Sequence, residues 1–144
     1  MNLVVNARDA MPEGGEIVVK TERLFVREAF RRDRATVEEG EYVSVTVTDQ
    51  GCGIPKENFQ KIFEPFYTTK RTGEGTGLGL STVYGIVKQS GGFIFVESDI
   101  GERTQFTLLM PFSTSEPTAT PKARAPNTAV RPMRKGSVIL LVED

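Results

Sequence analysis

The strongest constraint on this chain is a run of glycines at alternate positions that stands directly before a stretch with helical spacing. Residues 73–81 read GEGTGLGLS, and apolar residues three and four apart follow over 78–90 until Gly91-Gly92. This pattern predicts a helix that glycines both open and end. Free N–H groups at a helix start, together with the helix dipole, attract phosphate. The run therefore predicts a phosphate-binding helix start, and a flexible glycine linker is the alternative.

Two better-known phosphate motifs do not fit this run. The phosphate loop of P-loop NTPases ends in Gly-Lys-Ser or Gly-Lys-Thr, and that ending is missing here. A dinucleotide fingerprint follows a strand, whereas residues 67–72 are polar and basic.

A second feature is an acid at the end of an alternating strand. Over residues 42–49, Val43, Val45 and Val47 share one face, and Asp49 continues their period toward the core. Glycines follow at 51 and 53, which allow a sharp turn and a close approach to a flat ligand. A buried carboxylate needs a partner, and an exocyclic amine such as that of adenine would supply one. An ordinary Asp-Gly turn is the alternative.

A third feature is an amide pair on the first predicted helix, residues 1–11. Asn2 and Asn6 lie one turn apart, and Asp9 continues the same side. Two amide oxygens at this spacing can hold a magnesium ion that keeps several waters. A solvated polar helix face is the alternative.

The remaining pattern predicts an α+β fold, a two-layer α/β sandwich. Strands are expected at 16–26, 42–49, 93–97 and 104–112, and helices at 1–11, 55–63 and 78–90. Residues 27–41 read as a charged connection. Helices and strands do not alternate strictly, so a doubly wound parallel sheet fits less well.

Composition excludes several classes of protein. The chain has no histidine and one cysteine, which rules out Ser-His-Asp chemistry and leaves little basis for a zinc site. The net charge of -1 gives no reason to expect a nucleic-acid partner. No apolar run approaches the length of a membrane span, and the single cysteine favours a cytoplasmic location.

The chain divides into three parts. Residues 1–112 carry the features above. Residues 113–136 are rich in Pro, Ser, Thr and Ala without apolar periodicity, which predicts a disordered linker. Residues 137–144, SVILLVED, read as one buried strand that ends in two acids.

Taken together, these motifs resemble the catalytic ATP-binding domain of histidine kinases, whose Bergerat or GHKL fold is shared with gyrase-type and Hsp90-type ATPases. Five boxes occur in family order. They are the N box Asn2-x3-Asn6, the G1 box Asp49-x-Gly51-x-Gly53-Ile54, the F box with Phe59, Phe63 and Phe66, the G2 box from Gly75 to Leu80, and a last box from Gly101 to Phe106. SVILLVED resembles the first strand of a response-regulator receiver domain.

The resemblance implies ATP and Mg²⁺ as ligands. Asn6, with Asn2, would carry the magnesium, Asp49 would bind the adenine amine with Thr104 nearby, and residues 56–77 would form a lid. Lys70 in that lid is either a phosphate contact or a solvated charge. The implied nucleotide contacts are Asn2, Asn6, Asp49, Gly51, Gly53, Ile54, Lys70, Gly75, Thr76, Gly77, Leu78, Gly79, Leu80 and Thr104.

The resemblance also implies partners. Kinase domain, linker and receiver in one chain form a hybrid histidine kinase, and the wording NARDAMP and GEGTGLGLSTVYGIV is similar to alphaproteobacterial cell-cycle kinases. The expected partners are dimerisation helices that carry the phosphoacceptor histidine and a receiver domain, within a homodimeric parent that a membrane segment could anchor. Asn2 stands where gyrase-like relatives place a glutamate base, which disfavours a hydrolase.

The domain is expected to lack its first elements, since Met1 lies almost at the N box. Part of the sheet edge and core would then be uncovered. A remnant that binds nucleotide or partners without transferring phosphate is the alternative function.

Overall fold

The computed structural model describes residues 2–33, 35–70 and 75–112. The predicted linker at 113–136, the receiver-like strand at 137–144 and Gly73 of the glycine run lie outside the described residues.

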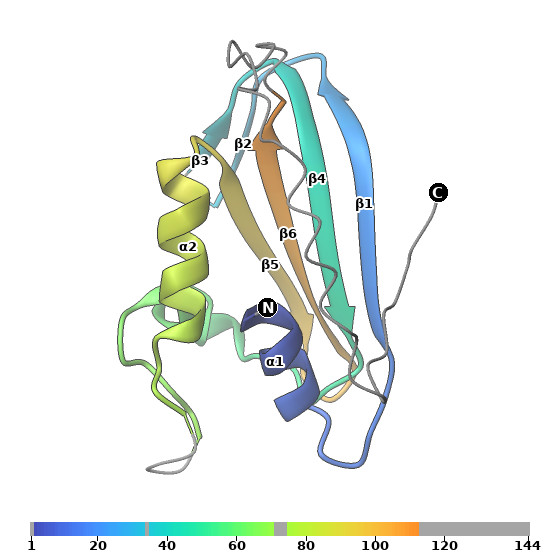
Figure 1. The fold of residues 1–144 in the computed structure, drawn as a ribbon, viewed down its shortest axis with the longest axis vertical. Coiled ribbons are helices and arrows are strands. Elements are labelled where there is room, and N and C mark those ends of the chain that lie inside the picture. Colours follow the sequence, from blue (N-terminus) through green and yellow to red (C-terminus); the bar gives the residue numbers. More distant parts are fainter. Residues whose placement is uncertain (1, 34, 71–74, 113–144) are drawn as a thin grey trace, which may run out of the picture. The chain divides into compact units, whose positions relative to one another are not determined.

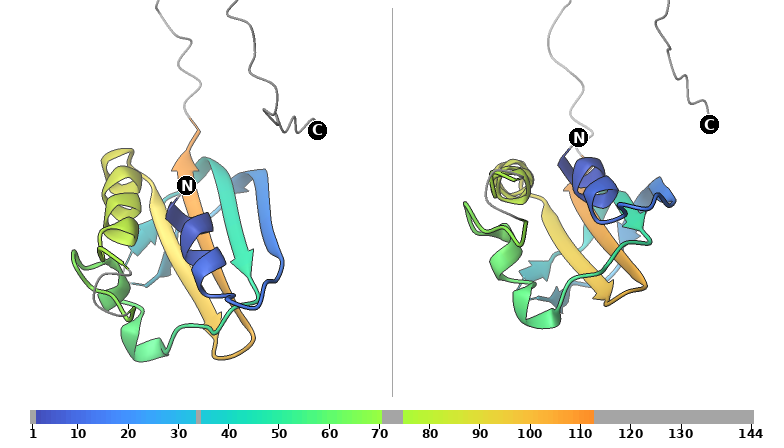
Figure 2. Two further views of the ribbon diagram at one scale, coloured as in Figure 1. Left: turned by 60° about the horizontal axis from the view of Figure 1, so that its bottom comes forward. Right: turned by 90° about the horizontal axis from the view of Figure 1, so that it is seen from below.

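An antiparallel sheet of four strands forms the main layer, in the order β1-β4-β6-β5. Its strands are β1 (Ile17–Val26), β4 (Gly40–Asp49), β5 (Phe93–Asp99) and β6 (Arg103–Pro111). Helices α1 (Asn2–Asp9) and α2 (Gly79–Gln89) lie together over one face of this sheet (Figures 1 and 2). The arrangement is the predicted α+β two-layer sandwich.

The main core lies between the helices and the sheet. Leu3 of α1 and Val87 of α2 meet Val47 and Phe106 of the two central strands, and all four are at least 93% buried. The three-four spacing of the helices and the alternation of the strands both aim these side chains at the same layer. The predicted inward phase of β4 is therefore confirmed at Val47 and Asp49.

A second apolar cluster on the opposite face corrects the expected connection at 27–41. There β2 (Phe30–Arg32) and β3 (Ala35–Val37) pair as a hairpin behind the sheet (Figure 1). Val37 is fully buried against Tyr42, Phe95 and neighbouring residues. Strands of three residues are too short to show a period, so packing on the sheet decides this hairpin.

The expected helix at 55–63 is also wrong. Two separate 3₁₀ turns occur instead, η1 (Lys56–Asn58) and η2 (Lys61–Phe63), closed by bonds from the Phe59 and Glu64 N–H groups to the Lys56 and Lys61 carbonyls. Short 3₁₀ pieces are typical of connectors, and these turn Phe59, Ile62 and Phe63 toward the main core.

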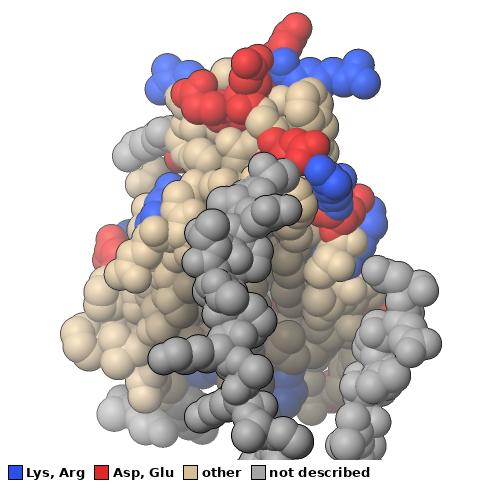
Figure 3. All heavy atoms as spheres, turned by 45° about the horizontal axis from the view of Figure 1, so that its top comes forward, with Lys and Arg blue, Asp and Glu red and all other residues tan. Residues whose placement is uncertain are grey.

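The surfaces of the described part are mixed. Strand β1 is an edge strand that exposes Val18 and Val19 by about half. At the opposite end of the sheet from the β4–η1 turn, acidic and basic side chains lie beside one another (Figure 3), and one such pair is Arg23 with Glu41 at 2.5 Å. Within the described ranges no helix is long and apolar enough to cross a membrane.

Candidate functional site

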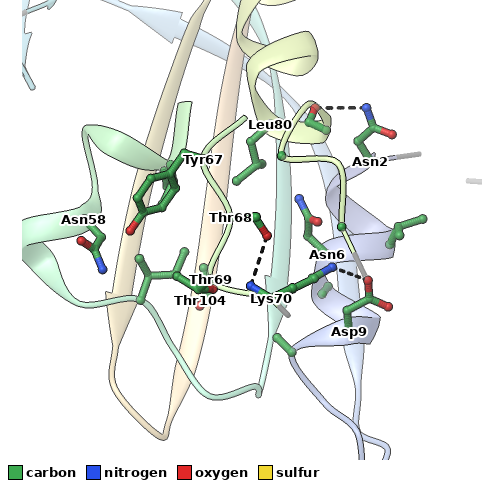
Figure 4. Close-up of a pocket in the computed structure, with 18 of the residues that line it drawn as sticks. Asn2, Asn6, Asp9, Asn58, Tyr67, Thr68, Thr69, Lys70, Leu80 and Thr104 are labelled. Carbon is green, nitrogen blue, oxygen red and sulfur yellow. Dashed lines mark hydrogen bonds and ion pairs between the residues drawn. The ribbon is translucent and has the colours of Figure 1, made fainter. Parts of the chain in front are cut away.

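One cavity of about 680 Å³ lies between the two helices and the ends of β4 and β6 (Figure 4). It collects most of the residues predicted from separate motifs along the chain. The predicted residues that line it are Asn2, Asn6, Asp49, Gly53, Ile54, Lys70, Gly75, Thr76, Gly77, Gly79, Leu80 and Thr104. Gly51 and Leu78 do not line the cavity, although both stand beside residues that do.

The cavity has a closed end, formed by Asp49, Thr104 and the turn at 51–54. Asp49 ends β4 and pairs in register with Thr104 of β6, and each residue is 3% exposed. The Asp49 Oδ1 atom accepts a hydrogen bond of 2.9 Å from the Gly51 N–H, whereas Oδ2 has no bond to any described residue. Burial raises the pKa of this carboxyl above its ordinary value of 3.8, and the Gly51 bond partly opposes that rise.

Close packing explains the glycines of this turn. A Cβ on Gly51 would lie 2.6 Å from the Ala10 Cβ atom, and one on Gly53 would lie 2.5 Å from the Asp99 carbonyl oxygen. Gly53 also has a φ of +75°, which favours glycine. The Cys52 N–H donates to the Ala10 carbonyl. The turn is thus held between the end of α1 and the β5–β6 turn.

Ser98 is a residue of the closed end that the motifs did not reveal. It stands on β5 opposite Thr104 and is 6% exposed. Its Oγ atom accepts from the Ile54 N–H at 2.8 Å, donates to the Arg103 carbonyl at 2.9 Å, and lies 2.9 Å from the Thr104 hydroxyl. A single serine after an apolar strand carries no sequence signal for these contacts.

The other end of the cavity is open and charged, and Asn6, Asp9 and Lys70 form it. Asp9 and Lys70 point toward each other across the cavity mouth (Figure 4), with Lys70 Nζ 2.5 Å from Asp9 Oδ2. Lys70 and then Arg8 lower the pKa of the Asp9 carboxyl. Asp9 was aligned with the two asparagines by spacing, but only the fold shows that it meets Lys70.

The start of α2 contacts α1 and lines the cavity. The Asn2 Nδ2 group donates to the Gly79 carbonyl at 3.1 Å, which ties α1 to the first turn of α2 (Figure 4). Gly77, with a φ of +66°, packs directly against the Phe66 backbone, and the Phe66 N–H donates to the Gly77 carbonyl. These contacts hold the glycine-opened end of α2 against the cavity.

The donor set at the open end fits a hard cation. The Asn6 amide and the Asp9 carboxylate both line the cavity and offer oxygen ligands. Magnesium binds through one or two such groups, with waters and ligand phosphates completing its shell. The Nδ2 group of Asn2 is engaged with Gly79, so only its Oδ1 atom could take part.

Comparisons with known proteins agree with this geometry. Residues 1–114 match the family model described as histidine kinase-, DNA gyrase B-, and HSP90-like ATPase. Over 111 residues the chain is 51% identical to sensor kinase CckA of Brucella abortus (strain 2308) and 34% identical to sporulation kinase E of Bacillus subtilis (strain 168). These matches cover 77% of this chain but only 12% and 13% of those kinases.

Solved structures show the same fold. The catalytic domain of histidine kinase ThkA superposes with a TM-score of 0.58 at 35% identity, covering 76% of this chain and 61% of that domain. Full-length ShkA in complex with AMPPNP gives a TM-score of 0.55 at 28% identity, covering 79% of this chain and 21% of ShkA. The chain belongs to the family of histidine kinase-, DNA gyrase B- and HSP90-like ATPases.

Proposed function

We propose that this domain binds ATP with Mg²⁺ and serves the transfer of the terminal phosphoryl group to a histidine in two-component signalling. One observation carries the proposal: a single cavity joins a buried carboxylate, Asp49, to a glycine-opened helix start. The kinase relatives and the nucleotide bound to ShkA support the same reading.

The closed end suits the adenine. The Oδ2 atom of Asp49 accepts no hydrogen bond from a described residue, and Asp49 lines the cavity, so an exocyclic amine can bond to this oxygen. Cys52, Gly53 and Ile54 of the packed turn line the cavity, so a ring can lie against them. A charged hydrogen bond of this kind contributes about 1.5–3 kcal/mol.

The open end suits the triphosphate. The first N–H groups of α2 are free of helical partners and carry the positive end of its dipole. Lys70 stands at the mouth and can exchange its Asp9 partner for a phosphate oxygen. Asn6, with Asp9 and Asn2 nearby, is the ligand we assign to magnesium, which neutralises phosphate charge when bound.

Phosphoryl transfer fits this site better than hydrolysis. Asn2 occupies the place of a general base, and its amide cannot take a proton from water at neutral pH. The nucleophile would come from a histidine on dimerisation helices, and a receiver domain would accept the phosphoryl group next. These partners, the homodimeric parent and the cytoplasmic location belong to the proposal.

Titration of the full chain with a non-hydrolysable ATP analogue, with and without Mg²⁺, tests the binding step. We expect Mg²⁺-dependent binding that Asn6→Ala weakens and that Val4→Ala, an exposed substitution on the same helix, leaves unchanged. Equal binding by wild type and Asn6→Ala at every Mg²⁺ concentration would place the cation elsewhere, and no binding by wild type would reject the proposal.

Transfer has its own assay. With labelled ATP, a histidine-bearing helical pair from a kinase relative should be labelled in trans, whereas the chain alone should not, since it has no histidine. Binding without any transfer would favour the alternative of a nucleotide-binding remnant.

A further inference from the structure

The Ser98 hydroxyl has three polar neighbours and only one proton. Its oxygen accepts a hydrogen bond from the Ile54 N–H, and a backbone N–H can only donate. The Arg103 carbonyl can only accept, so the contact at 2.9 Å requires the Ser98 proton. The placement of the hydroxyl proton is thereby determined by its neighbours.

This placement fixes the proton of Thr104 in turn. The Thr104 oxygen lies 2.9 Å from Ser98 Oγ, and the Ser98 proton is already committed to Arg103. Only the Thr104 hydroxyl can donate across that contact. Its remaining capacity toward the cavity is therefore to accept hydrogen bonds.

Three nearby backbone donors are committed as well. The Gly51 N–H donates to Asp49, the Cys52 N–H to the Ala10 carbonyl, and the Ile54 N–H to Ser98. Asp49 as a carboxylate also only accepts. The side chains of Asp49 and Thr104 thus offer lone pairs to whatever enters the closed end.

We infer that Ser98 is a specificity-determining positioning residue, which holds the Thr104 hydroxyl as an acceptor and so selects a nucleotide base with a 6-amino group over one with a 6-keto group. The inference rests on the proposed nucleotide site. A primary amine brings two donors to two acceptors, whereas a carbonyl oxygen would face the lone pairs of Asp49 and Thr104, each of which is 3% exposed. Sites built around a polar partner reject ligands that cannot make the bond far more strongly than apolar pockets do.

ATP and inosine triphosphate test this directly, because inosine carries a carbonyl oxygen where adenine carries the amine. Both are titrated with Mg²⁺ into wild type, Ser98→Ala and Ser44→Ala. Ser44 is a matched control, since it is 4% exposed on β4 and does not line the cavity. We expect wild type and Ser44→Ala to prefer ATP by at least about tenfold. In Ser98→Ala the Thr104 proton is free to turn toward the cavity, and the preference should fall at least about fivefold.

The ratio of the two affinities separates this role from a structural one, because a loosened site would weaken both ligands together. In a Thr104→Val background, replacing Ser98 should no longer change the ratio. If Ser98→Ala does not fold, Ser98→Cys, a weaker donor of similar shape, should show a smaller shift in the same direction.

The outcomes are distinct. A ratio that stays constant in a folded Ser98 variant overturns the inference and leaves ATP binding intact. A Ser98 effect that persists undiminished in Thr104→Val also overturns it, since the proton of Thr104 would not be responsible. Failure of wild type to bind ATP would instead reject the proposed function.

Discussion

The two ends of the cavity are built on different physical principles. The closed end consists of buried residues, Asp49, Ser98 and Thr104, which hydrogen bonds within the fold hold in place. The open end relies on charges near water. The side chains of Lys70 and Asp9 are 32% and 25% exposed, and each can exchange the other for a different partner. Buried polar networks hold a unique geometry, whereas exposed ion pairs contribute little and rearrange readily.

This difference suits a site that reads one part of a ligand and releases another. A base must be recognised in one orientation, so its contacts need a rigid frame. A phosphoryl group that leaves the site needs contacts that can change during the reaction. The comparison predicts that equivalent changes at the two ends have unequal effects.

The largest contrast is expected between two glycines. Gly53→Ala combines a left-handed backbone with a Cβ placed 2.5 Å from the Asp99 carbonyl oxygen, and should destabilise the fold by roughly 2–5 kcal/mol. Gly75→Ala meets the flexible Lys70 side chain at 3.1 Å and the Thr68 hydroxyl at 3.3 Å, and should cost less than about 1 kcal/mol. Urea unfolding measures both.

Gly14→Ala separates the two causes at Gly53. Gly14 has a φ of +88° with open space around it, so only the backbone cost of about 1–2 kcal/mol applies. Similar losses at Gly14 and Gly53 would show that the turn is not tightly packed.

The next effect concerns ligand affinity at the closed end. Asp49→Asn replaces one acceptor oxygen with a donor and removes the charge, so nucleotide binding should weaken by about 1–3 kcal/mol. Calorimetry with an ATP analogue measures this, together with unfolding to show that the variant is folded. Unchanged affinity would remove Asp49 from base recognition.

A smaller effect is expected at the open end. Lys70→Ala should weaken nucleotide binding by about 0.2–1 kcal/mol, because its charge is partly exposed and already has a carboxylate partner. The loss should shrink as salt is added, since screening acts on exposed charges. An affinity change as large as that of Asp49→Asn, insensitive to salt, would contradict the contrast between the ends.

The smallest expected effect is on the pH dependence of stability, to which the carboxyls at the two ends contribute with opposite sign. The raised pKa of Asp49 means that its protonated form is favoured by burial, so its contribution to stability falls as pH rises from 3.8 through the folded value. The lowered pKa of Asp9 means that its contribution is present at neutral pH and is lost as pH falls through the folded value below 3.8.

The free energy of unfolding is measured across this pH range in both variants. Asp49→Asn should remove the slope due to Asp49, and Asp9→Asn should remove the slope due to Asp9. Nucleotide affinity should follow Asp49, weakening as pH falls through its folded pKa. Slopes of the same sign in both variants would show that the two carboxyls share one environment.

Local patterns were enough to predict much of the site. Alternation placed Asp49 inward, and three-four spacing placed Leu80 and Val87 on one side of α2. The glycines marked the turn after β4 and the start of α2. Each of these features depends on neighbours within a few residues, so its period is visible in the sequence.

Long-range partners were not predictable in the same way. Ser98 acquires its role from Ile54, which is 44 positions away, and Lys70 meets Asp9 across 61 positions. The hairpin of β2 and β3 and the two 3₁₀ turns were not predicted either, because packing on the sheet outweighs the weak local preference of such short pieces.

The sequence by itself therefore determined the layers of the fold, the family and many of the residues that line the cavity. Only the tertiary structure decided which of their atoms are already engaged, at Asp49 Oδ1, Asn2 Nδ2 and the Ser98 hydroxyl. The physical reason is that periodicity records which face a side chain occupies, whereas hydrogen-bond capacity is divided among neighbours that meet only after folding.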